Sequence, residues 1–114
     1  MILAGDATGA LHVWATAKGS DAACKYLGAP AAHEGTLYSL CVHDATSVFS
    51  GGADGKMCAW KLADGALPAR CAETTADSTL PLLAVASQKD ALSAIFSGGA
   101  DGRVRQWTLS LIHI

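Results

Sequence analysis

The chain contains three copies of one short segment, and each copy ends in a tryptophan. The copies occupy residues 4–14, 50–60 and 97–107, and their tryptophans lie 46 and then 47 residues apart. A period in the forties is typical of small antiparallel sheets that stack on their neighbours, because one such unit cannot bury both of its faces alone. The spacing therefore predicts an all-β chain built from repeated sheets.

Alternation of apolar and polar residues predicts where the strands of each repeat lie. In the middle repeat, strands are expected at 36–42, 47–50, 56–60 and 67–72. In the third repeat, strands are expected at 80–86, 92–97 and 103–107. The first repeat begins inside a strand at Met1, so its opening strand is missing. We therefore expect a partial unit at 1–32, a complete unit at 33–75 and a partial unit at 76–108.

Four residues of the complete unit carry a family resemblance. They are His33 before the first strand, Ser50 in the second, Asp54 in the following turn and Trp60 at the end of the third. This arrangement resembles the WD-repeat family, whose pattern has the same residue types at these positions. The dipeptide Trp-Asp, which gives the family its name, is missing from all three copies.

The other two copies keep less of the pattern. The third copy has a partial set, Ser97, Asp101 and Trp107. No histidine occurs in the region 76–79, where the family pattern would place one. The first copy keeps its two glycines and Trp14, with Thr8 in the place of the aspartate.

The resemblance implies an all-β fold of four-stranded antiparallel propeller blades. The chain would hold about two and a half blades of an incomplete WD-repeat β-propeller. It also implies a structural tetrad in which the Trp60 indole donates to Ser50, Ser50 is linked to His33, and His33 to Asp54. Such a chain of bonds lets a carboxylate stay charged inside a blade, where it would otherwise be costly to bury.

A serine, a histidine and an aspartate could alternatively form a hydrolase triad. Ser50, however, lies inside a strand before two glycines and has no nucleophile elbow around it. The four cysteines contain no Cys-x-x-Cys pair, and the glycine-rich turns lack the Lys-Ser/Thr of a phosphate loop. We therefore predict no catalytic, cofactor-binding or metal-binding residue, and expect the cysteines to be small buried side chains in a reducing compartment.

Charge and hydropathy bear on the partners. The chain has 8 basic and 10 acidic residues and a net charge of −2, which does not favour nucleic acid as a partner. No apolar run approaches the roughly 18 residues that cross a bilayer. The expected partners are other proteins and the remaining blades of the same full-length chain.

The last six residues, 109–114, do not continue the repeat. Their sequence, Leu-Ser-Leu-Ile-His-Ile, is what CTG-TCT-CTT-ATA-CAC-ATC encodes, a string that resembles the mosaic-end adapter of transposase-based sequencing libraries. We interpret the segment as a sequencing-adapter artefact and exclude it from functional reasoning. The alternative is an ordinary apolar fourth strand.

The resemblance also implies a function. The motif Phe-Ser-Gly-Gly-Ala-Asp-Gly-x4-Trp at 49–60 and 96–107 is similar to that of echinoderm-type microtubule-associated proteins. This implies a non-catalytic, cytoplasmic and cytoskeletal scaffold for protein–protein interaction, with tubulin as a partner. Two alternatives stay open: a substrate-presenting adaptor of a ubiquitin ligase, and the accessory propeller of an enzyme whose catalytic domain lies elsewhere.

Overall fold

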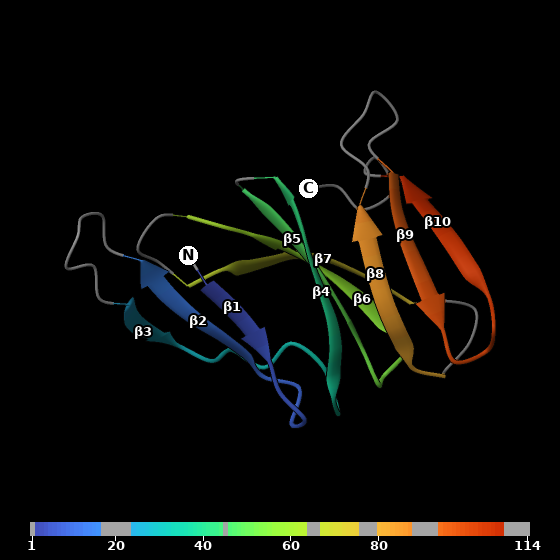
Figure 1. Cartoon of the computed structure of the whole chain (residues 1–114), viewed down its shortest axis with the longest axis horizontal. Coiled ribbons are helices and arrows are strands. Elements are labelled where there is room, and N and C mark those ends of the chain that lie inside the picture. Colours follow the sequence, from blue (N-terminus) through green and yellow to red (C-terminus); the bar gives the residue numbers. More distant parts are fainter. Residues whose placement is uncertain are drawn as a thin grey trace.

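The computed structural model describes residues 2–16, 24–44, 46–63, 67–75, 80–87 and 94–108. These residues form three antiparallel sheets, which follow one another in sequence order along the molecule (Figure 1). The N-terminal sheet contains β1 (Ile2–Gly5), β2 (Leu11–Thr16) and β3 (Cys24–Gly28). The central sheet contains β4 (Leu37–Asp44), β5 (Ser47–Gly52), β6 (Lys56–Lys61) and β7 (Ala69–Thr75). The C-terminal sheet contains β8 (Leu82–Ser87), β9 (Ala94–Gly99) and β10 (Val104–Thr108).

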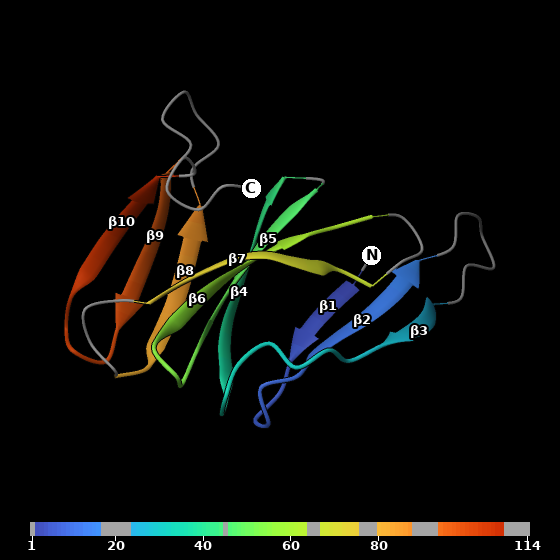
Figure 2. The ribbon, with the colours of Figure 1, turned by 180° about the vertical axis from the view of Figure 1, so that it is seen from behind.

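The expectation of an all-β chain is confirmed for the described residues. In each sheet, strands that follow one another in sequence are antiparallel neighbours. The central sheet lies between the other two, as the views from the front and from behind both show (Figure 2). Four strands are present in the central sheet and three in each of the outer sheets within the described ranges. None of these residues forms a helix with the length and hydrophobicity that crossing a bilayer requires.

Copies in the sequence form the same hairpin in the structure. The three hairpins are β1–β2, β5–β6 and β9–β10. In each turn a glycine N–H donates to the carbonyl three residues earlier, at 3.1 to 3.2 Å. These glycines, Gly9, Gly55 and Gly102, have φ angles of 90°, 75° and 79°. Because side chains are strained in this left-handed region, the turn requires glycine there.

Irregularities in strand pairing repeat as well. The register of β4 on β5 shifts between Leu37 and Ser39, and that of β8 on β9 shifts between Leu82 and Ala84. Leu37 pairs with Gly52, and Leu82 with Gly99, so the first strands of the central and C-terminal sheets are equivalent. This equivalence is the basis for comparing positions between sheets below.

Apolar side chains pack between the sheets in two clusters. One cluster joins the N-terminal and central sheets and includes Leu11 and Val13 against Val48 and Trp60. The other joins the central and C-terminal sheets and includes Phe49, Met57 and Ala59 against Leu82, Val85 and Ile95. Because side chains alternate along a strand, β5 and β6 contribute to both clusters, and the central sheet is buried on both faces.

One expectation about side chains, that the cysteines are buried, needs correction. Cys58 is buried, but Cys24 is exposed and Cys41 half-buried, so the cysteines are not uniformly core residues. The side chain of Cys71 lies outside the described residues. Cys24 is the first residue of β3, and the first three residues of that strand are all exposed.

Candidate functional site

The hairpin of the central sheet brings three of the four tetrad residues together. Ser50 lies in β5 and Trp60 in β6, while Asp54 lies in the turn between the two strands. Ser50 pairs with Cys58, so Trp60, two residues further along β6, is on the same face and diagonally opposite Ser50. His33 precedes β4, and its backbone N–H donates to the carbonyl of Gly9 at 3.1 Å. The N-terminal hairpin therefore positions the fourth residue.

These residues are joined by hydrogen bonds in the expected order. The Trp60 indole N–H donates to Ser50 Oγ at 3.0 Å. Ser50 Oγ lies 2.8 Å from His33 Nε2, and His33 Nδ1 lies 2.9 Å from Asp54 Oδ1. A carboxylate accepts, so Nδ1 carries the proton, and a neutral His33 accepts the Ser50 hydroxyl proton at Nε2. Each of the three polar hydrogens in this set, on the Trp60 indole, the Ser50 hydroxyl and His33 Nδ1, then has one acceptor.

Burial makes these bonds energetically important. Ser50 is fully buried, Trp60 is 3% exposed and the side chain of His33 has no exposed surface. Burial alone would raise the pKa of Asp54, but hydrogen bonds from His33 and from the backbone N–H groups of Lys56 and Glu34 lower it below its usual value. The Asp54 side chain, 10% exposed, is thus held as a carboxylate by its donors.

The geometry bears directly on the hydrolase alternative. A serine nucleophile must be reachable by its substrate, and an oxyanion hole must lie beside it. Ser50 has no exposed surface, and its oxygen also accepts the Trp60 indole proton. This arrangement is suited to satisfying buried polar groups rather than to attacking a substrate.

In the C-terminal sheet, the three residues of the partial set are not joined in one chain of hydrogen bonds. Trp107 donates its indole N–H to Ser97 Oγ at 3.0 Å. Asp101 accepts from the Arg105 guanidinium at 2.8 Å and from the Arg103 backbone N–H at 3.0 Å. The Arg105 bond is the main cause that lowers the pKa of Asp101. An arginine two residues before the tryptophan thus holds the aspartate that the sequence left without a histidine.

The N-terminal hairpin carries a polar cluster that the sequence analysis missed. Asp6 accepts from the backbone N–H groups of Thr8 and Ala10 and from the Thr8 hydroxyl. Its other oxygen lies 2.7 Å from His12 Nε2, and His12 Nδ1 lies 3.0 Å from the Tyr26 hydroxyl. The Thr8 hydroxyl bond is the main cause that lowers the pKa of Asp6. Asp6 lies two positions before Thr8, the residue that aligns with Asp54, so a position-by-position comparison of the copies does not identify it.

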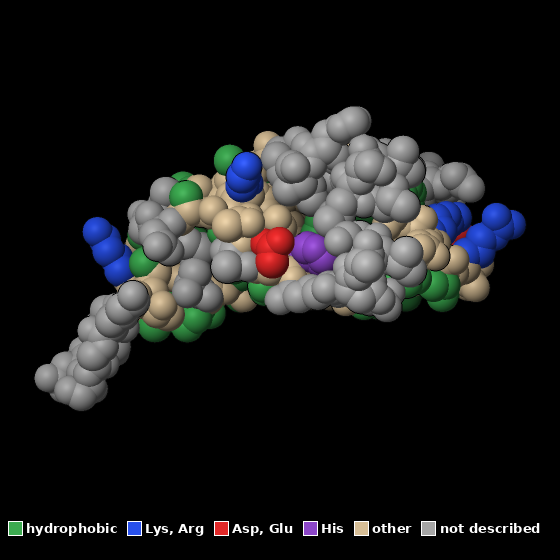
Figure 3. Space-filling model, turned by 90° about the horizontal axis from the view of Figure 1, so that it is seen from above, with side chains coloured by type: hydrophobic (Ala, Val, Ile, Leu, Met, Phe, Trp, Pro, Cys, Tyr) green, Lys and Arg blue, Asp and Glu red, His purple; other side chains and the backbone are tan. Residues whose placement is uncertain are grey.

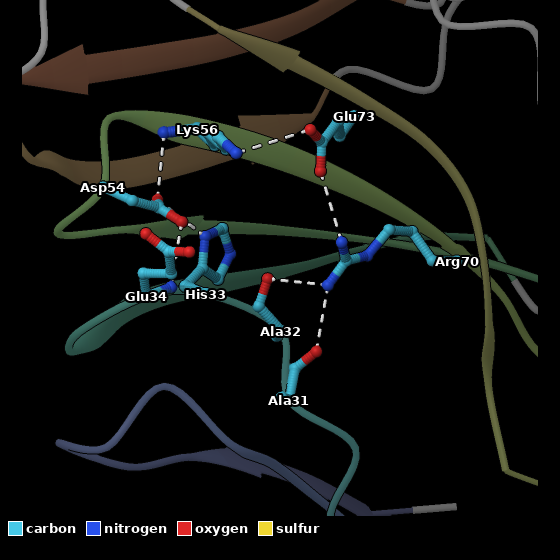
Figure 4. A pocket seen from close by; sticks show the side chains of 8 residues that line it. All are labelled: Ala31, Ala32, His33, Glu34, Asp54, Lys56, Arg70 and Glu73. Atoms are coloured by element: carbon cyan, nitrogen blue, oxygen red, sulfur yellow. Dashed lines mark hydrogen bonds and ion pairs between the residues drawn. The ribbon is translucent and has the colours of Figure 1, made fainter.

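A pocket of about 220 Å³ opens beside the tetrad (Figure 4). Its lining consists of Ala31, Ala32, His33, Glu34, Asp54, Lys56, Arg70 and Glu73. Arg70 reaches from β7 to the carbonyls of Ala31 and Ala32, at 2.9 and 3.0 Å, and its guanidinium lies 5.2 Å from the Trp60 ring centroid. Arg70 therefore links the outer strand of the central sheet to the segment before β4.

Both cations that line this pocket pair with one carboxylate. Glu73 lies between Arg70 and Lys56, at 3.2 and 3.5 Å (Figure 4). The paired side chains are 37% to 41% exposed, so these ion pairs add little to stability. Because both cations that line the pocket face the Glu73 carboxylate, the pocket presents no unpaired cation to an anionic ligand.

Metal-binding groups and related sequences give no further assignment. Within the described residues, no group of three or more His, Cys, Asp or Glu side chains could hold a metal ion. On the surface that Figure 3 describes, Lys and Arg side chains lie at separate places instead of forming one basic patch. No protein-family model matches the chain, and comparison with curated proteins finds no match.

Proposed function

We propose that the three sheets are successive blades of a WD-repeat β-propeller, with units at 1–32, 33–75 and 76–108. Support comes from the three equivalent hairpins, each closed by the same hydrogen bond at a left-handed glycine. The hydrogen-bonded set of His33, Ser50, Asp54 and Trp60 adds to it, because these are the residue types of the family pattern.

We further propose that the chain is a non-catalytic scaffold for protein–protein interaction. The observation that carries this proposal is the burial of Ser50, which leaves the Ser-His-Asp set without access to a substrate. Several large apolar side chains of the strands are instead exposed, among them Val104 at 78% and Val42 at 59%. Exposed apolar side chains of this size are a means of contacting other proteins. By resemblance, tubulin is the proposed partner, and the proposed location is the cytoplasm at the cytoskeleton.

The catalytic alternative is tested with an active-site probe. A fluorophosphonate, which modifies accessible nucleophilic serines, should leave Ser50 of the native chain unlabelled in intact-mass and peptide-mapping measurements. The matched control is the same chain denatured before exposure, which should also remain unlabelled because an unactivated serine is a weak nucleophile. Native-state labelling of Ser50 that disappears in His33→Gln would contradict the scaffold proposal.

The partner is tested by co-sedimentation of the full chain with microtubules assembled from purified tubulin. We expect a saturable pelleted fraction for the unaltered chain and a smaller one for Val104→Glu. This variant places a charge at an exposed position and should leave the fold intact. A chain that stays in the supernatant at every tubulin concentration would contradict tubulin as the partner.

A further inference from the structure

Each of the three hairpins has an aspartate in its turn, and this aspartate fixes the turn through the backbone. Its carboxylate accepts from the N–H group two residues later, at 2.9 to 3.1 Å in the three copies. These bonds join Asp6 to Thr8, Asp54 to Lys56 and Asp101 to Arg103. The three turns share this bond and differ in the further groups that hold the aspartate.

In the two outer sheets the further group comes from the same hairpin. Asp6 lies 2.7 Å from the His12 imidazole, and Asp101 accepts from the Arg105 guanidinium at 2.8 Å. Both of these partners stand two residues before the tryptophan that ends the copy. In the central sheet this position is Cys58, which is buried and whose thiol donates to a backbone carbonyl before β4. The central turn therefore depends on groups from outside its hairpin.

Those groups belong to segment 31–34, which precedes β4 (Figure 4). Besides the Lys56 N–H, Asp54 accepts from His33 Nδ1 at 2.9 Å and from the backbone N–H of Glu34 at 3.1 Å. Of its three donors among the described residues, two thus come from this segment. In the same part of the chain, both donors of Asp101 come from the β9–β10 hairpin itself.

Segment 31–34 is in turn held by the N-terminal sheet. The N–H groups of Ala32 and His33 both donate to the carbonyl of Gly9, at 2.9 and 3.1 Å. Gly9 closes the β1–β2 turn, and a Cβ built on it would overlap the His33 carbonyl. The β1–β2 turn and the segment therefore fit closely, and His33 links the turn of the N-terminal sheet to the turn of the central sheet.

This linkage also determines the shape of the pocket. Residues 31–34 line it together with Asp54 and Lys56. A movement of the segment away from the N-terminal sheet would remove these four residues from the lining and leave Asp54 with the Lys56 N–H alone. The β9–β10 turn does not depend on such a segment for its aspartate, because Arg105 lies in the same hairpin.

We propose that the β5–β6 turn and the pocket beside it form a docking-dependent surface. They keep the described conformation only while the N-terminal sheet holds segment 31–34, so a local opening between these two sheets releases the turn and the pocket together. The β9–β10 turn stays closed during that opening, because Arg105 holds Asp101 from within the hairpin. The coupling is reciprocal, so a ligand that holds the pocket closed also holds the two sheets together. This device goes beyond the proposed scaffold function, because it operates in the chain without a partner.

The test is native-state hydrogen exchange of the full chain, followed by NMR at increasing urea below the unfolding transition. The reporters are the amides of Ala32 and His33, which donate to Gly9, and the turn amides of Lys56 and Arg103. We expect Lys56 to show the same opening free energy and urea dependence as Ala32 and His33, because one opening exposes all three amides. Arg103 should follow a different opening. An opening shared by all four amides, or one of Lys56 separate from Ala32 and His33, would overturn the proposal.

Two variants separate this coupling from a general loss of stability. Val13→Ala loosens the cluster between the N-terminal and central sheets, and it should speed exchange at Lys56 about tenfold and at Arg103 less than about twofold. The matched control, Val85→Ala, makes the same change in the cluster between the central and C-terminal sheets and should leave exchange at Lys56 unchanged. In His33→Ala the link is already broken, so adding Val13→Ala should not speed exchange at Lys56 further.

No acceleration at Lys56 in Val13→Ala, or an equal acceleration at Lys56 and Arg103, would overturn the proposal. A response of Lys56 to Val85→Ala as large as its response to Val13→Ala would also overturn it. If Val13→Ala does not fold, the exchange of the unaltered chain decides alone. All of these measurements are made without a partner, so a chain that fails to pellet with microtubules would contradict tubulin as the partner and leave this inference standing.

Discussion

Replacing Ser50 by alanine removes one oxygen atom from the tetrad and changes the packing very little. Ser50 Oγ is the acceptor of the Trp60 indole N–H at 3.0 Å and the partner of His33 Nε2 at 2.8 Å. In Ser50→Ala both groups lose their partner, and water cannot easily replace it because Trp60 is only 3% and His33 only 6% exposed. The equivalent change in the C-terminal sheet, Ser97→Ala, affects one group, the indole N–H of the half-buried Trp107.

The size of the effect follows from the number of groups left without a partner. A buried donor or acceptor without a partner costs about 1–3 kcal/mol, so the two groups affected by Ser50→Ala should together lower the free energy of unfolding by about 2–6 kcal/mol. Ser97→Ala should lower it by about 1 kcal/mol, because water can reach part of the Trp107 indole. For a urea dependence of about 1.5 kcal/mol per M, the midpoints should fall by about 1.3–4 M and about 0.7 M.

The assay is urea unfolding of the full chain and the two variants, followed by tryptophan fluorescence and circular dichroism. An unchanged slope shows that stability, and not the compactness of either state, was altered. The double variant Ser50→Ala with Asp54→Ala should lose less than the sum of the single losses, because both act on His33. Equal losses for Ser50→Ala and Ser97→Ala, or strict additivity in the double variant, would refute the reasoning.

Three further outcomes are expected. The pKa of Asp54 is lower in the folded chain than its usual 3.8, so its stabilisation is present above that pH and is lost as the pH falls toward the folded pKa. Asp54→Asn should therefore destabilise the chain at pH 7, and this destabilisation should shrink in urea titrations as the pH falls below 3.8. Gly51→Ala should destabilise by about 1–3 kcal/mol through the close approach of its Cβ to the next sheet, whereas Gly98→Ala should be nearly neutral in the same titrations. Iodoacetamide should modify the exposed Cys24 in the native chain, but Cys58, whose pKa burial raises to about 11, only in denaturant, as followed by peptide mass spectrometry.

Much of the architecture could be predicted from the sequence because it depends on local signals. Three turns ending in Gly9, Gly55 and Gly102 require a left-handed residue, and only glycine adopts that conformation without strain. Alternation of apolar residues between such turns predicts two-sided strands, and the period of the tryptophans predicts how many hairpins repeat. Residues 109–114 lie outside the described residues, so the interpretation of that segment stays a prediction.

The sequence by itself determined the repeat, the hairpins and the members of the central hydrogen-bonded set. The spacing of Ser50, Asp54 and Trp60 follows from strand pairing within one hairpin, and His33 was identified by the family resemblance. Only the tertiary structure decided which partners the long side chains bind. Arg105 takes the place of a histidine for Asp101, and Arg70 crosses from β7 to the carbonyls before β4. Long side chains can reach several alternative acceptors, so their sequence positions do not specify which one they bind. The same holds for Gly51 and Gly98: their local sequences are alike, and the difference between a filled and an open interface arises from the next sheet alone.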